Sequence, residues 1–212
     1  MLSIIASAAA GFLVKLADDH AEAGVTTSAA YALAILYGAS IGAVCYFYPP
    51  MLTLWLAALA GVIAAGKIDS SIHLTGVATV GVSLFLISFD SLLSNIWLAY
   101  AIPFLLASFA DERFHESENK LLRQIASRRL FLDAAVLLVT AHYTLLHIPS
   151  NGNAVAIEDY MFVITLFCFD IAYFIASRLS GRLVPKRPLA AQDEEEQAVS
   201  VQTSQTTSSP AQ

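Results

Sequence analysis

Long apolar runs, separated by short polar segments, dominate the chain and predict its elements. A membrane-spanning helix needs about 17–25 mainly apolar residues. Seven runs approach or reach that length, at about 2–17, 25–48, 51–66, 72–89, 91–110, 129–148 and 159–180. The pattern therefore predicts an all-α fold, a polytopic integral membrane bundle of about seven transmembrane helices within residues 1–182.

Two of the runs carry small residues at four-residue spacing, which lets helix backbones approach closely in lipid. These residues are Ala30, Ala34, Gly38 and Gly42 in the second run, and Ala57, Gly61 and Ala65 in the third. Pro49 and Pro50 lie between the two runs and end the earlier helix. We therefore expect the second and third helices to pack as an antiparallel hairpin.

The stretch 72–110 allows two interpretations, because Asp90 and neighbouring polar residues interrupt an otherwise apolar sequence. As one helix it would extend more than about 50 Å, well beyond the roughly 30 Å of hydrocarbon. Two spans with a turn near Asp90 fit better, and a broken or re-entrant helix is the alternative. The polar residues 111–128 are expected to form an interfacial helix. Residues 183–212 are rich in charged, Ser, Thr and Gln residues and predict a disordered cytoplasmic tail.

Composition and charge placement support the membrane interpretation. The chain is 57% hydrophobic and 13% charged, whereas a soluble domain is about 25% charged. With seven spans, every Lys and Arg falls on one side: Lys15, Lys67, Arg113, Lys120, Arg123, Arg128, Arg129, Arg178, Arg182, Lys186 and Arg187. Basic residues accumulate in cytoplasmic loops. We therefore expect a multi-pass protein of the plasma membrane, with its N-terminus outside, its C-terminus in the cytoplasm and no nucleic-acid partner; the oligomeric state stays open.

Three polar motifs follow the first, third and fifth runs and would share the cytoplasmic side: KLADDHAE (15–22), GKIDSSIH (66–73) and ADERFHE (110–116). Carboxylate oxygens are the ligands that Mg²⁺ prefers, commonly with a phosphate as co-ligand. The predicted metal ligands are Asp18, Asp19, Asp111 and Glu112. Each motif also has an ordinary structural interpretation, as a solvated loop or the start of a charged interfacial segment.

The middle motif supplies the candidate acid–base residues. Asp69 and His73 are four positions apart and would share one face of a helix, which suits a general acid or base, although helix capping explains them as well. Lys67 would add positive charge, or it would set the topology as a snorkelling lysine.

Two aspartates fall inside apolar runs, Asp133 near the start of the sixth and Asp170 near the middle of the seventh. An aspartate at the centre of a membrane helix costs roughly 2.5–3.5 kcal/mol. Asp170 therefore needs either a partner that offsets this cost or a functional role, and we include it among the candidate catalytic residues.

Three classes of function fit these observations. The first is a Mg²⁺-dependent enzyme acting on a lipid or isoprenoid phosphate within the membrane. Membrane prenyltransferases also use two acidic motifs at cytoplasmic helix ends, but their NDxxD-type pattern is absent here. The second is a proton or divalent-cation transporter, which needs polar residues that continue to the outer face. The third is a structural or assembly protein without catalysis.

Overall fold

The computed structural model describes residues 1–24, 26–66, 68, 70–86, 98–115, 117–126, 129–146 and 157–183, and over these residues it is helical, with no strand. The expected all-α class is confirmed. The helices are α1 (Leu2–Glu22), α2 (Ser28–Phe47), α3 (Met51–Ala64), α4 (Ser71–Leu86), α6 (Leu98–His115), α7 (Lys120–Ala126), α8 (Leu130–Leu146) and α9 (Ile157–Leu183). Each apolar run of the sequence overlaps one of the longer helices, and α7 lies in the polar loop. Asp90 lies outside the described residues.

Local chemistry sets several helix ends. The Thr27 hydroxyl accepts a hydrogen bond from the Ala30 amide at 3.3 Å and caps α2. Pro49 and Pro50 separate α2 from α3. The Asn119 side chain accepts from the Leu121 amide at 2.9 Å and starts α7. These caps satisfy backbone amides that have no partner within their own helix.

Two helical segments of the described chain are long and apolar enough to cross a membrane, Ser28–Phe47 and Tyr160–Gly181. Three more are apolar but shorter: Met51–Ala64, Ser71–Leu86 and Leu130–His142. A helix rises about 1.5 Å per residue, so α3 is only about 21 Å long. Helix length by itself thus supports two spans rather than the expected seven.

Contacts between side chains define the directions of the helices. The Ser7 hydroxyl donates to the Thr165 carbonyl at 2.7 Å, and Gly11 lies against the Phe169 backbone. Residue numbers rise together along this contact, so α1 and α9 are parallel. The α6–α8 pair is antiparallel, because Asp111 contacts the start of α8 whereas Tyr100 contacts His142 near its end.

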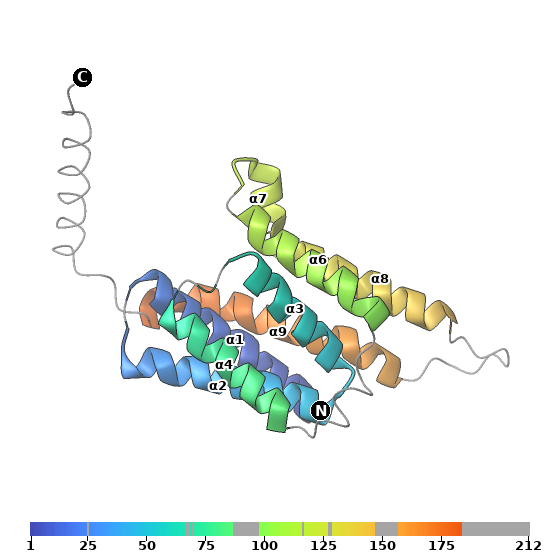
Figure 1. Cartoon of the computed structure of the whole chain (residues 1–212), viewed down its shortest axis with the longest axis horizontal. Coiled ribbons are helices and arrows are strands. Elements are labelled where there is room, and N and C mark those ends of the chain that lie inside the picture. Colours follow the sequence, from blue (N-terminus) through green and yellow to red (C-terminus); the bar gives the residue numbers. More distant parts are fainter. Residues whose placement is uncertain are drawn as a thin grey trace, which may run out of the picture.

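The remaining helices follow the same alternation. The Tyr31 and Ser71 hydroxyls are 2.8 Å apart, and further along the same helices Gly42 faces Ser83. Residue numbers again rise together, which makes α2 and α4 parallel. Figure 1 shows α6 and α8 side by side on one flank of the bundle, with α3 between α6 and the group of α1, α2 and α4. The chain therefore crosses the bundle in alternating directions from one long helix to the next.

The small residues pack closely, but not as the expected α2–α3 hairpin. Gly38 faces Thr79 of α4, and Gly61 faces the Leu105 carbonyl of α6, where an added Cβ would lie 2.8 Å from the oxygen. The helices α2 and α3 touch each other little; α2 packs on α1 and α4, and α3 packs on α6. The hairpin was expected because α2 and α3 are adjacent in sequence. Instead, the small-residue face of α2 packs against α4, and that of α3 packs against α6.

Large apolar side chains cover much of the outer surface. Exposed fractions reach 69% for Phe85, 76% for Leu86 and 70% for Leu138. Similar side chains lie exposed on α2, α6 and α9, among them Leu36, Ile102 and Ile171. The buried interior contains, by contrast, His20, Asp111 and several hydroxyl groups.

Candidate functional site

Charged side chains from five helices meet at one end of the bundle, where α1 and α6 end and α4 and α8 begin. We call this group the polar cluster: Lys15, Asp18, Asp19, His73, Asp111, Glu112, Arg129, Asp133, Asp170 and Tyr173. The opposite directions of consecutive helices bring these positions together, although they are far apart in sequence.

Asp18 of α1 joins residues of two other helices. One carboxylate oxygen lies 3.2 Å from His73 Nε2 of α4, and the other accepts a hydrogen bond from the Tyr173 hydroxyl of α9 at 3.3 Å. All three side chains are only partly accessible. A carboxylate that lies against one ring nitrogen of a histidine fixes the orientation of the ring. This arrangement can perform general acid–base chemistry.

Asp19 pairs within its own helix. Its Oδ1 lies 2.6 Å from Lys15 Nζ, one helical turn earlier, and the lysine also lies over the Tyr173 ring at 5.6 Å. The second oxygen, Oδ2, is buried and has no hydrogen-bond partner among the described residues. One Asp19 oxygen is therefore paired with Lys15, and the other has no polar partner in the described part of the chain.

Arg129 lies between the carboxylates of the polar cluster. Its guanidinium is 4.9 Å from the Tyr173 ring and 5.7 Å from the Phe169 ring, and Glu112, Asp18 and Asp170 attract its charge. The residue also has a left-handed backbone, with φ of 54°, which is uncommon for any residue except glycine. Strain of this kind persists only where the surroundings hold it, and it is frequent at functional sites.

Asp111 has a structural role that differs from the expected one. Its two oxygens accept hydrogen bonds from the Phe131 amide at 3.2 Å and the Leu132 amide at 2.9 Å. These bonds cap the start of α8 from another helix. Burial raises the pKa of the Asp111 carboxyl to about 6, because the two amide bonds only partly offset the loss of water.

The carboxyl groups of Asp133 and Asp170 interact electrostatically across the α8–α9 interface, where two negative charges would repel each other. A proton held on one of the two groups would relieve this repulsion, as in other carboxylate pairs. The Oδ2 atom of Asp170 is buried, and within the described residues no amide or hydroxyl donates to it. The partner that Asp170 needs is therefore supplied by Asp133 and by Arg129.

The predicted site residues are thus brought together only in part. Asp18 and His73 are in direct contact, and Asp170 joins the same cluster from α9. Lys67 and Asp69 lie outside the described residues. Of the predicted metal ligands, Asp111 is bound to backbone amides and Asp19 to Lys15. In the part of the chain that the structure describes, no three His, Cys, Asp or Glu side chains form a group suited to a metal ion, so Mg²⁺ stays a prediction.

Sequence reasoning missed the two residues at the centre of the cluster, Arg129 and Tyr173. The sequence pattern marks Arg129 only as a charge that sets topology, although this residue ends the polar loop directly before α8. Tyr173 lies three positions after Asp170, so both fall on one face of α9. This three-residue spacing is the sequence signal that links Tyr173 to Asp170.

No protein family, curated protein or solved structure matches the chain. The arrangement of the polar cluster is therefore the basis for a functional proposal.

Proposed function

We propose that this chain is a multi-pass membrane protein that crosses the bilayer seven times, with its polar cluster on the cytoplasmic side. The exposed apolar side chains on α2, α4, α6, α8 and α9 support this proposal, since a soluble protein rarely exposes such extensive apolar surface. The alternating helix directions support it as well. So does charge placement, because the described Lys and Arg residues all belong to the end where α1 and α6 finish. The shorter helices would then be accommodated by local thinning of the bilayer.

Within this bundle we infer an enzyme that acts on a lipid or isoprenoid phosphate. The observation that carries the inference is Asp18, held between His73 and Tyr173 from two other helices. His73 would donate or accept the proton, and Asp18 would orient its ring. Polar groups at one depth beside the lipid suit a reaction on a membrane substrate better than a continuous pathway.

Charge balance adds a requirement for the substrate. Carboxyl groups outnumber the basic side chains in the polar cluster, so an anionic phosphate would be repelled without an added cation. Arg129 and Lys15 supply part of the positive charge. Mg²⁺ bound to the phosphate would supply the rest, and the unpartnered oxygen of Asp19 is one carboxylate oxygen that could face it.

The test uses the full-length protein, purified in detergent and incubated with isoprenoid and phospholipid phosphates, with and without Mg²⁺. We expect turnover that falls at least about 100-fold in Asp18→Asn and His73→Gln, since general acid–base groups contribute roughly 10²–10⁴-fold. Arg178→Gln is the matched control, because Arg178 is an exposed charge that lies over the Phe174 ring of its own helix. Turnover that survives in both Asp18 and His73 variants would exclude this assignment.

A second candidate function is proton transport, and the Asp133–Asp170 pair favours it. Carboxyl groups that share a proton inside a membrane bundle are common in proton relays. In sealed vesicles with an internal pH dye, a transporter would move protons in response to a pH gradient, and Asp170→Asn would abolish the flux. Absence of flux together with lipid turnover would leave the enzyme as the function.

A further inference from the structure

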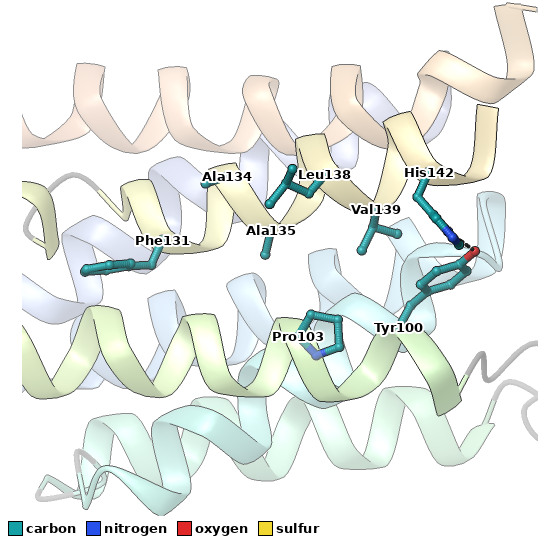
Figure 2. A pocket seen from close by; sticks show the side chains of 8 residues that line it. All are labelled: Tyr100, Pro103, Phe131, Ala134, Ala135, Leu138, Val139 and His142. Carbon is teal, nitrogen blue, oxygen red and sulfur yellow. Dashed lines mark hydrogen bonds between the residues drawn. The ribbon is translucent and has the colours of Figure 1, made fainter. Parts of the chain in front are cut away.

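An open groove runs between α6 and α8, on the flank of the bundle. Its volume is about 450 Å³, within the roughly 300–1,000 Å³ typical of ligand sites. Figure 2 shows the lining side chains on both helices, with Ala135 and Val139 directed toward α6 and Pro103 facing them. The small alanine side chains on α8 leave this space open.

The two ends of the groove differ in chemistry. At one end, Phe131 belongs to the turn that Asp111 caps, directly after Arg129, so this end lies beside the polar cluster. At the other end, the Tyr100 hydroxyl and His142 Nδ1 form a hydrogen bond of 3.3 Å across the groove (Figure 2). The walls between them are apolar. Phe131 and His142 are 11 positions apart on α8, which is about 16 Å along a helix.

We propose that this groove binds the hydrocarbon chain of the substrate, a single-chain isoprenoid or acyl phosphate. The phosphate lies at the Phe131 end, and the Tyr100–His142 pair limits the length of the chain. This inference rests on the proposed enzymatic function and identifies the part of the substrate that the polar cluster does not contact.

Three observations select a lipid chain as the occupant. Leu138, which lines the groove, is exposed among other apolar side chains, so the groove opens toward the lipid phase. Its walls offer apolar contacts with polar groups only at the far end, which suits a chain and not a peptide. The apolar length of the groove, with the polar cluster beside its Phe131 end, matches the two parts of an amphiphile.

Binding is tested separately from turnover, with an isoprenoid monophosphate that carries a photoreactive diazirine at the end of its chain. We expect crosslinks on Tyr100, Val139 or His142, located by peptide mass spectrometry. Ala135→Phe fills the groove and should reduce these crosslinks at least about tenfold. Ala141→Phe is the matched control, because Ala141 is exposed on the same helix and does not line the groove.

The outcomes separate the two proposals. Equal crosslinking in Ala135→Phe and Ala141→Phe, or crosslinks confined to other helices, would overturn the groove assignment even if the enzyme is active. Groove crosslinks without turnover of any phosphate would support the binding site and count against the enzyme. Ala134→Phe, at an exposed lining position, provides a second blocked variant if Ala135→Phe does not fold.

The length limit has its own readout. Tyr100→Ala removes the ring that closes the groove, so longer chains should bind with affinity close to that of shorter ones. In the unmodified protein we expect affinity to fall at least about tenfold once the chain exceeds the groove. An unchanged preference for chain length in Tyr100→Ala would refute the role of the Tyr100–His142 pair.

Discussion

The two halves of the bundle place polar groups in different ways. In the half away from the polar cluster, single hydroxyls donate to carbonyls of a neighbouring helix, as Ser7 does to Thr165 at 2.7 Å. In the polar cluster, charged side chains from five helices gather around Arg129. A neutral hydroxyl needs one acceptor, whereas a partly buried charge needs several partners to offset its loss of water. A hydroxyl of this kind therefore links one pair of helices, whereas the polar cluster requires all five of its helices to be in place.

Among the substitutions that test this difference, replacing Arg129 should have the largest effect on the free energy of unfolding. Arg129→Gln removes the cation that the carboxylates of Asp18, Glu112 and Asp170 attract, and leaving buried charge uncompensated costs up to about 3–5 kcal/mol. We expect that loss in the free energy of unfolding, measured by denaturant titration in detergent. Arg178→Gln, at an exposed position, should change it by less than about 0.5 kcal/mol. Similar stability of the two variants would show that the cluster does not need Arg129.

A substitution at the close contact between α1 and α9 should have the second-largest effect on stability. A Cβ added at Gly11 would overlap the Phe169 carbonyl, a backbone group that cannot rotate away. Overpacking of this kind costs about 1–3 kcal/mol, so Gly11→Ala should lower the midpoint of thermal unfolding clearly. Gly81→Ala is the control, since nothing lies within 4 Å of an added Cβ there. Equal midpoints would mean that α1 and α9 are not in close contact.

Asp111 gives the polar cluster a dependence on pH. Its folded pKa of about 6 lies above the unfolded value near 3.9. The stability that comes from protonated Asp111 is therefore fully present below about pH 4 and is lost as pH rises through 6. Asp111→Asn cannot titrate, although it gives up one of the two amide bonds. The stability of the unmodified protein relative to Asp111→Asn should thus fall between pH 4 and 7, by up to about 3 kcal/mol. A constant difference would contradict the raised pKa.

The Tyr100–His142 pair should matter least for stability. His142 is exposed and Tyr100 is partly buried at the rim of the groove, and their hydrogen bond is long at 3.3 Å. Tyr100→Phe should change the free energy of unfolding by less than about 0.5 kcal/mol. A cost above about 1.5 kcal/mol would mean that this end of the groove is part of the structural core.

The sequence alone determined the helical class and the position of each long helix, because apolar runs and their polar or proline-containing breaks are local signals. It also indicated that Asp170 needs a partner, since a charge within an apolar helix is costly, and it marked Asp18 and His73 as candidate site residues. Only the tertiary structure decided which partners they have. Asp111 became a cap for α8, Asp18 joined His73 and Tyr173, and α2 packed on α4 instead of α3. These outcomes depend on which helix faces meet across long sequence separations, and small residues and charges specify that a partner is needed without specifying which one.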